Sequence, residues 1–384
     1  MKFNVNSKDL LRNLKIVNSV IQNKCSLPIL ANVLFGQRDG GFTLTGSSPE
    51  NSLTVPIAIT LNAGDDFKPF CLYPVDLLPL LSSLADQPLT VEVNYDAHTV
   101  TFIYSSGKVT LPFEDADQYP PVAKMDVPKA QFDIATNIFL PATLAASANT
   151  AQDELRPVMM AVALDVNADE GRVTFVGTDG QSLYKYAYTH GVPFLKAGGD
   201  DLFLLPASVV KAVNTAFASA ETITVTHDGK HICIEHEGVV FVIRDIEGKY
   251  PAYERVIPKD CPYHIVLPTK SLAAAVNRVR LMANDSTQMV KLAKEDMFLT
   301  LSASDYDFSK SANEELELAD VENPCTLPAG FAIGFKSTTL LKLLNVITTD
   351  NVRIELTSPS VALLIKEDAP NSALTELLMP MTLD

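Results

Sequence analysis

FCLYPVDLLPLL, residues 70–81, has two counterparts later in the chain, LFLLPASVVKAV at residues 202–213 and FAIGFKSTTLLKLL at residues 331–344. In each, a short apolar run predicts a strand, and apolar residues at helical spacing predict a helix directly after it. The aligned positions Pro74, Pro206 and Lys336 are 132 and 130 residues apart, about a third of the 384-residue chain. Solenoid repeats are about 20–50 residues long, so this period indicates three whole domains in tandem.

Further matches extend the repeat on both sides of this stretch. Each copy begins with a short strand that leads into an amphipathic helix, at residues 1–20, 130–149 and 263–282. Alternating runs then predict half-buried strands, in GFTLTGSSP, RVTFVGTDG and MFLTLSASD. The Tyr-Pro pair at Tyr119 recurs 131 residues later at Tyr250. The sequence therefore predicts an α+β protein of three similar modules, residues 1–127, 128–255 and 256–384, each with two helices and about eight strands.

Composition and motifs argue against several classes of protein. No run approaches about 18 apolar residues, and the N-terminus lacks the apolar core of a signal peptide, so we expect a cytoplasmic protein. The five scattered cysteines are predicted to be reduced. In HDGKHICIEH, Asp-Gly predicts a hairpin turn that separates His227 from His231 and Cys233, with His236 in the next loop. We therefore expect no metal, no cofactor and no catalytic site.

The charge of the chain is unevenly distributed along the sequence. The chain carries −16 in total, which by itself disfavours binding to nucleic acid. The six predicted helices, at residues 7–24, 75–85, 139–152, 206–220, 268–284 and 336–349, sum to +8 and leave −24 for the rest. At a screening length of about 8 Å, a basic helical face and an acidic remainder would act almost independently. The alternative is that helices simply tolerate Lys and Arg well.

Five short motifs, spread in order along the chain, resemble one known family. They are LPIL at residues 27–30, RPVMMAVALD at 156–165, TDGQSL at 178–183, YPAYERVIPK at 250–259 and MPM at 379–381. Together with the opening MKF, they resemble the beta subunit of bacterial DNA polymerase III, the replicative sliding clamp. The resemblance implies a head-to-tail homodimer in which six modules close a ring around duplex DNA without reading its sequence. Helices would line the hole and strands would form the outside.

The resemblance also explains why the chain ends on the apolar run ELLMPMTLD, residues 376–384. In the family, the C-terminal residues form one wall of a pocket for short peptides of the polymerase and the clamp loader. The matching positions are Leu377, Leu378, Met379, Pro380 and Met381. The facing wall is implied to be Met159, Thr178, Gly180, Leu183, Pro251, Arg255 and Val256. Burial of one leucine or aromatic side chain of a partner stabilises binding by about 1.5–3 kcal/mol. The alternative is that these residues only close the fold.

Two further sets of residues are implied by the resemblance. The candidate DNA contacts are Lys24, Arg156, Arg278 and Arg280, with a structural ion pair as the alternative for the three arginines. The candidate dimer contacts are Leu281 and Met282 of one copy against Val109 and Leu111 of the next, with an internal core as the alternative.

The sequence also departs from the family pattern. The family commonly has His-Arg after TDG, where this chain has Gln181-Ser182, which removes a cation from the edge of the expected pocket. Asp384 follows the usual terminal leucine and adds one charge there. The competing hypothesis for function is a three-module protein-binding scaffold that does not encircle DNA.

Overall fold

The computed structural model describes residues 1–22, 25, 27–122, 125–189, 194–196, 201–295 and 298–383. Contacts between Cα atoms divide the chain into two compact units. Unit 1 comprises Met1–Pro141, Asn167–Gly171 and Gly191–Ile246, and unit 2 comprises Ala142–Val166, Arg172–His190 and Glu247–Asp384. Within the described ranges, no helix is long and apolar enough to cross a membrane.

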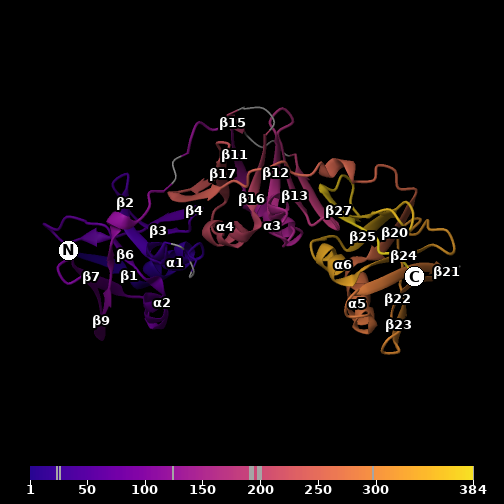
Figure 1. Ribbon diagram of the computed structural model, residues 1–384, viewed down its shortest axis with the longest axis horizontal. Helices are drawn as coiled ribbons and strands as arrows, with labels where there is room; N and C mark the ends of the chain where they lie inside the picture. The colour runs from indigo at the N-terminus through magenta and orange to yellow at the C-terminus, as the bar shows by residue number, and fades with distance from the viewer. Residues whose placement is uncertain are drawn as a thin grey trace. The chain divides into compact units, whose positions relative to one another are not determined.

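The order of helices and strands repeats along the chain (Figure 1). In the first third the elements are β1 (Lys2–Asn6), α1 (Ser7–Asn18), β2 (Val33–Arg38), β3 (Gly41–Ser47), β4 (Asn51–Pro56), β5 (Thr60–Leu61), β6 (Phe70–Leu72), α2 (Pro74–Ser83), β7 (Pro88–Asn94), β8 (Thr99–Tyr104), β9 (Gly107–Pro112) and β10 (Glu114–Asp115). Short 3-10 turns, η1 (Pro28–Ala31) and η2 (Ala116–Gln118), interrupt this order.

The second and third parts follow the same plan. The second contains β11 (Ala130–Ala135), α3 (Thr136–Ala148), η3 (Pro157–Met160), β12 (Ala161–Asn167), β13 (Arg172–Thr178), β14 (Ser182–Tyr188), β15 (Phe194–Lys196), β16 (Asp201–Pro206), η4 (Ala207–Val209), α4 (Val210–Phe217), β17 (Thr222–His227), β18 (His231–His236), β19 (Val239–Arg244) and η5 (Tyr253–Arg255). The third contains β20 (Tyr263–Pro268), α5 (Thr269–Val279), η6 (Arg280–Met282), β21 (Met289–Glu295), β22 (Phe298–Asp305), β23 (Lys310–Glu315), β24 (Ala332–Lys336), α6 (Ser337–Leu344), β25 (Asn351–Leu356), β26 (Leu363–Glu367) and β27 (Leu374–Leu378).

The α+β prediction is confirmed, and so are two α-helices in each third of the chain among the described residues. The helix bounds differ from the predicted ones. Helix α1 ends at Asn18 rather than at residue 24, and at this end both the backbone N–H and the hydroxyl of Ser19 donate hydrogen bonds to the carbonyl of Ile16. The bounds of α5 and α6 also differ, so two cations of the charge count lie outside the α-helices, Arg280 in η6 and Lys336 in β24. Lys24 lies outside the described residues.

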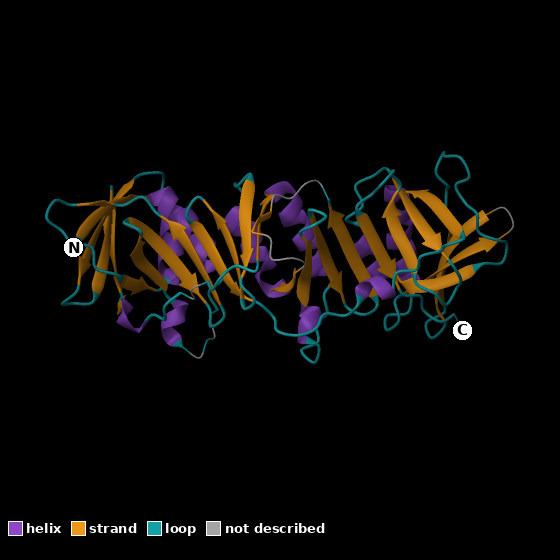
Figure 2. Cartoon of the chain, turned by 90° about the horizontal axis from the view of Figure 1, so that it is seen from above, coloured by secondary structure: helices purple, strands orange, loops and turns teal. Residues whose placement is uncertain are grey.

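Each unit contains one long and one short antiparallel sheet. In unit 1 the strand orders are β10-β6-β2-β3-β4-β19-β18-β17-β11-β15 and β5-β1-β7-β8-β9. Unit 2 contributes β12-β13-β14-β27-β26-β25-β20 to its long sheet and has β23-β22-β21-β24 as its short sheet. In both long sheets, a strand from the end of one repeat pairs with the preceding repeat, as β19 with β4 and β27 with β14. Figure 2 shows strands running side by side, with helices behind them.

Helix α1 illustrates how the sequence positions these helices. The side chain of Asn6 accepts hydrogen bonds from the backbone N–H groups of Lys8 and Asp9, which fixes where the helix begins. Its apolar stripe, which includes Leu10, Leu14 and Val17, is buried, and the helix packs against β3 and β4.

The close approach of α1 to the sheet requires a glycine. A Cβ on Gly46 in β3 would lie 2.2 Å from the carbonyl oxygen of Val17 in α1. In the second repeat, a Cβ on Gly177 would lie 2.0 Å from the carbonyl oxygen of Ala146 in α3. These two glycines are 131 residues apart, the period of the repeat. Backbone contact between helix and strand is therefore a shared feature of the first two repeats.

Gly46→Ala is expected to destabilise the protein by about 2 kcal/mol or more, because a backbone carbonyl cannot move aside as a side chain can. Gly36→Ala is the matched control, since Gly36 lies in neighbouring β2 and a Cβ there would have no atom closer than 3.6 Å. Urea unfolding of both variants measures the difference. Equal stability of Gly46→Ala and Gly36→Ala would show that α1 does not depend on this contact.

Candidate functional site

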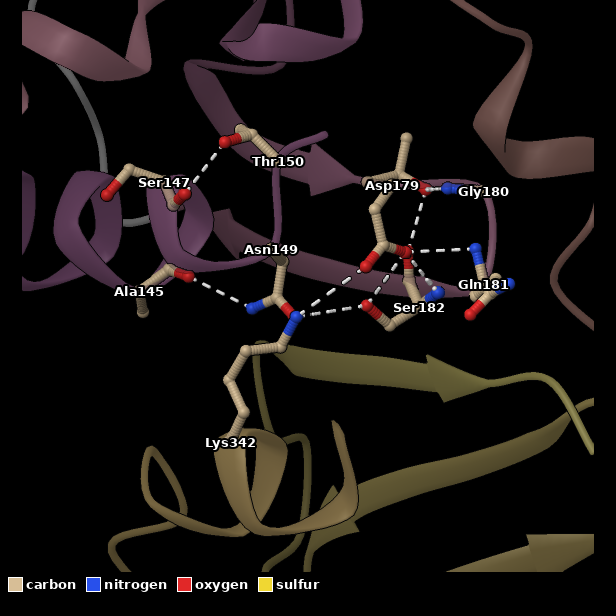
Figure 3. Close-up of polar contacts among 10 residues, drawn as sticks. Ala145, Ser147, Asn149, Thr150, Asp179, Gly180, Gln181, Ser182 and Lys342 are labelled. Atoms are coloured by element: carbon tan, nitrogen blue, oxygen red, sulfur yellow. Dashed lines mark hydrogen bonds and ion pairs between the residues drawn. The ribbon is translucent and has the colours of Figure 1, made fainter. Parts of the chain in front are cut away.

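The turn between β13 and β14 is held by its own side chains. Asp179 Oδ1 accepts hydrogen bonds from the backbone N–H groups of Gln181 and Ser182, at 2.9 and 2.7 Å, and from the Ser182 hydroxyl at 3.1 Å. Thr178 Oγ1 donates to the carbonyl of Ser182 and accepts from the N–H of Gly180. Gly180 has a φ of +86°, which favours glycine. The sequence TDGQS therefore encodes a defined turn, which Figure 3 shows in full.

The C-terminal tail is attached to this turn. Strand β27 pairs with β14, with Leu377 opposite Leu183 and Leu378 opposite Ser182. Beyond the strand, the N–H of Met379 donates to the carbonyl of Gln181 at 2.8 Å, and the N–H of Met381 donates to the carbonyl of Gly334 at 2.7 Å. The apolar run is thus both the end of a sheet and a segment that leaves it, and the side chain of Met379 is exposed.

The last part of the tail packs closely against Gly334. A Cβ on Gly334 in β24 would lie 2.8 Å from the side chain of Leu383 and 3.2 Å from the sulfur of Met289. Because β24 is at an edge of its sheet, the tail covers backbone groups that would otherwise be open there.

The opposite side of the turn faces η3. Buried Met159 and exposed Arg156 both approach Gly180, and a Cβ there would lie 3.6 Å from Met159 Cε and 3.5 Å from an Arg156 guanidinium nitrogen. A cavity of about 420 Å³ lies beside the turn, lined by Ala151, Gln152, Asp153, Arg156 and Asp179.

The segment that contains Pro251, Arg255 and Val256 is anchored on the same face of the sheet as Leu183. Lys185, two residues beyond Leu183 in β14, forms an ion pair with Glu254. The Tyr253 hydroxyl donates to a carboxylate oxygen of Asp165, and burial with this carboxylate raises the pKa of Tyr253. Pro251, Arg255 and Val256 are all exposed.

The structure brings several predicted pocket residues into direct contact or register. Met159 meets Gly180, Thr178 pairs with Leu183, and Leu183 pairs with Leu377. Leu378 follows Leu377 in the strand and is buried on the opposite face. Pro380 and Met381 are half-buried along the tail.

Lys342 and Glu376 are two charged residues that the sequence analysis missed. Lys342 in α6 lies 3.7 Å from Asp179 Oδ2, with its side chain partly buried. Glu376 in β27 is fully buried, and neither carboxylate oxygen has a hydrogen-bond partner among the described residues. Burial raises the pKa of Glu376 well above its usual value, although the charge of Lys342 lowers it. In the sequence, each is a single charged residue within a mainly apolar run, LLKLL for Lys342 and LTELL for Glu376, and this pattern could have identified both as candidates.

The predicted DNA contacts have different surroundings. Arg278 in α5 forms a two-point ion pair with Glu314 in β23, and this contact raises the pKa of Arg278. Arg280 is half-buried, and its Nε has no hydrogen-bond partner in the part of the chain that the structure describes. Arg156 lies beside the turn at Gly180 rather than on a helix. Their role in DNA binding stays a prediction.

The predicted dimer residues lie at two open sheet edges, one in each unit. Val109 and Leu111 are half-buried in β9, an edge strand of unit 1. Leu281 and Met282 are exposed in η6, which packs against β22 and edge strand β23 of unit 2. The turn between β22 and β23 also exposes two aromatic side chains, Tyr306 and Phe308, which the sequence analysis missed.

The histidine-rich hairpin is built as predicted, with one difference. Asp228 and Gly229 form the turn between β17 and β18, and His236 ends β18 rather than lying in the next loop. Both ring nitrogens of His227 are hydrogen-bonded to carboxylates. Among the described residues, no group of three or more His, Cys, Asp or Glu could hold a metal ion.

Comparison with known proteins gives consistent matches over the whole chain. Family models for the N-terminal and C-terminal domains of the DNA polymerase III beta subunit match residues 1–123 and 254–382. Among curated relatives, beta sliding clamps from Haemophilus influenzae and Escherichia coli K12 are 22% and 24% identical, with 100% of each chain covered.

Solved structures support the fold independently. A sliding clamp from Pseudomonas aeruginosa has a TM-score of 0.89 at 23% identity, with 100% of both chains covered. The beta subunit from Thermotoga maritima has a TM-score of 0.88 at 19% identity, again with 100% of both chains covered. At these identities, the likeness establishes the fold.

Proposed function

Because the chain belongs to the family of the DNA polymerase III beta subunit, we propose that it is a DNA sliding clamp that encircles duplex DNA and tethers the replicative polymerase. The observation that carries the proposal is the match of both terminal domain models to the two ends of the chain. The protein would work in the cytoplasm, where bacterial DNA is replicated. It would catalyse no reaction of its own, because a closed ring makes the polymerase processive by keeping it linked to the DNA.

The two open sheet edges support closure into a ring. Strand β9 is an edge strand of unit 1 and β23 is an edge strand of unit 2. Exposed edges are templates for pairing with another chain. If β9 of one copy pairs with β23 of a second, the interface is head-to-tail, and two such interfaces close a ring. The exposed apolar residues Leu281, Met282, Tyr306 and Phe308 would be covered in that assembly.

The turn and the tail support a pocket for short peptides of the polymerase and the clamp loader. The exposed side chains of Met379 and Val256 offer adaptable apolar contacts, and methionine suits sites that bind several partners. Met379 is held next to the turn by its backbone hydrogen bond to Gln181, so the wall is ordered before a peptide arrives.

The basic helical residues support electrostatic contact with the DNA backbone. Lys8 and Lys15 in α1, Lys211 in α4 and Lys270 in α5 are exposed. Contacts of this kind are independent of sequence and weaken with salt, which permits sliding.

Retention on circular DNA tests the proposal. Loaded by its cognate clamp loader and ATP onto a nicked plasmid, the protein is expected to co-elute with circular DNA in gel filtration. It should dissociate when the plasmid is cut once, because a ring slides off a free end. Equal retention on circular and linear DNA would show ordinary binding instead. Peptide binding without retention on either form would favour the protein-binding scaffold.

A further inference from the structure

Lys342 occupies an unusual position in helix α6. Its neighbours Leu340, Leu341, Leu343 and Leu344 are buried, so the lysine interrupts an apolar stretch. Its side chain is 27% exposed, and its ammonium donates to the Ser182 hydroxyl at 3.3 Å and lies 3.7 Å from Asp179 Oδ2 (Figure 3). A partly buried ammonium needs such partners, because burial of an unpaired charge is costly.

Both partners of Lys342 belong to the turn that carries the pocket. Asp179 uses Oδ1 for the three hydrogen bonds that shape the turn, which leaves Oδ2 for the lysine. The Ser182 hydroxyl also lies 3.4 Å from Asn149 Oδ1, and Asn149 in turn donates to the carbonyl of Ala145. The network therefore connects the end of α3, the turn and α6 within unit 2 (Figure 3).

The same turn is attached to the tail through its backbone. The carbonyl of Gln181 accepts the hydrogen bond from Met379, and Gly180 contacts Met159 on the other side. A shift of the turn would move both apolar walls of the pocket. The charge that steadies the turn comes from a residue 160 positions away in sequence from Ser182.

Lys342 contacts a position at which the sequence departs from the family pattern. The family commonly has His-Arg after TDG, whereas this chain has Gln181-Ser182. The buried serine points to the face of the sheet where Lys342 lies. The cation beside Ser182 therefore comes from α6 and lies on the face of the sheet opposite to Leu183.

We propose that Lys342 is a positioning residue of the peptide pocket, which holds the Asp179–Gln181 turn against the tail. The inference rests on the proposed function of the pocket as a peptide-binding site. Lys342 acts through Asp179 and Ser182, so its charge sets peptide affinity without touching the peptide.

Fluorescence anisotropy with a labelled peptide that carries a Gln-Leu-x-Leu-Phe core tests this inference. Lys342→Met keeps most of the apolar stem and removes the charge, and is expected to weaken binding on the order of 10-fold. Lys342→Arg should bind within about 3-fold of the wild type, because it restores a cation that can reach both partners. A chain that lacks residues 379–384 should not bind at all.

Lys366→Met is the matched control. Lys366 forms an ion pair with Glu355 in the same unit, and its side chain is 31% exposed, close to the value for Lys342. It lies in β26, away from the turn, so its loss should change thermal stability and leave peptide affinity unchanged. Binding is measured well below the melting temperature of each variant, so that a loss of folded protein does not appear as a loss of affinity.

The outcomes separate the two proposals. If the wild type does not bind the peptide, the pocket is not a peptide site and the inference fails with it. If the wild type binds and Lys342→Met binds equally well, the pocket stands and only the role of Lys342 is wrong. Equal losses in Lys342→Met and Lys342→Arg would also overturn the inference, because the charge would then not be what matters.

Discussion

Leu281→Lys is expected to convert the proposed dimer into a monomer and to abolish retention on circular DNA. Leu281 is 68% exposed in η6 beside edge strand β23, so most of this large apolar side chain is open to solvent. A lysine there would bring an unpaired charge into the proposed interface. We expect dimer affinity to fall at least 100-fold, equivalent to about 3 kcal/mol.

Analytical ultracentrifugation at micromolar concentration measures this change. Val127→Lys is the matched control, because Val127 is 81% exposed and lies outside the elements proposed to meet. Neither variant should change the melting temperature of the folded chain or its affinity for the peptide, since both residues are exposed and outside the pocket.

A second variant tests whether the two edges meet. Val109→Glu in β9 should also give a monomer, and Val109→Glu with Leu281→Lys should regain part of the dimer through an opposite-charge pair across the interface. A dimer that persists in Leu281→Lys would place the interface elsewhere. Monomers in all three variants would show that residues 109 and 281 do not face each other.

The sequence predicted the repeat because its signals are local. The strand-to-helix stretches around Pro74, Pro206 and Lys336 each fold within a few residues, and all three are strands followed by helices or 3-10 turns. The TDG turn was also readable, since Asp and Gly specify its backbone directly. The family resemblance then suggested the candidate pocket, because the tail and the turn are short motifs.

The remaining features depend on contacts between distant residues. Nothing in the local sequence shows that Lys342 meets Asp179 and Ser182, or that the glycine at position 46 is required by a helix carbonyl. Glu376 is another example. It is opposite Tyr184 in one long sheet, and the equivalent position in the other long sheet, opposite Leu53, is occupied by Phe241. The buried acid can be recognised only when the two long sheets are compared.

His227→Gln is expected to lower the stability of the protein, because the side chain is buried between two carboxylates. The imidazole is 4% exposed, with Nδ1 2.6 Å from Asp201 Oδ2 and Nε2 3.1 Å from Asp245 Oδ2. It stacks on Phe203 with ring centroids 4.6 Å apart. The histidine therefore connects the start of β16, the end of β17 and the segment after β19.

The charge of His227 determines how this contribution varies with pH. Burial alone would lower its pKa, but the hydrogen bonds to Asp201 and Asp245 raise it from 6.5 to about 9. A pKa raised in the folded state stabilises the protein fully below pH 6.5, and the contribution disappears as the pH rises through 9. The raised pKa of His227 corresponds to about 3 kcal/mol of folding stability at pH 6.

In His227→Gln, the two carboxylates of Asp201 and Asp245 remain close together without a counter-charge. We expect a loss of about 3 kcal/mol at pH 6, measured by urea unfolding, and faster hydrogen exchange in β16 and β17. The difference from the wild type should shrink above pH 9, where the wild-type histidine is itself neutral.

His231→Gln is the control, because His231 makes one contact to a carboxylate, at 3.4 Å from Asp228 Oδ2, and is more exposed. The loss of stability in His231→Gln should be small and should not vary with pH in the way expected for His227→Gln. If the free energy of unfolding differs between wild type and His227→Gln by the same amount from pH 6 to pH 10, packing on Phe203 stabilises this region and the charge of His227 does not. A stability difference that disappears with rising pH would instead show that a buried histidinium holds β16 and β17 together, next to the turn that was all the sequence predicted here.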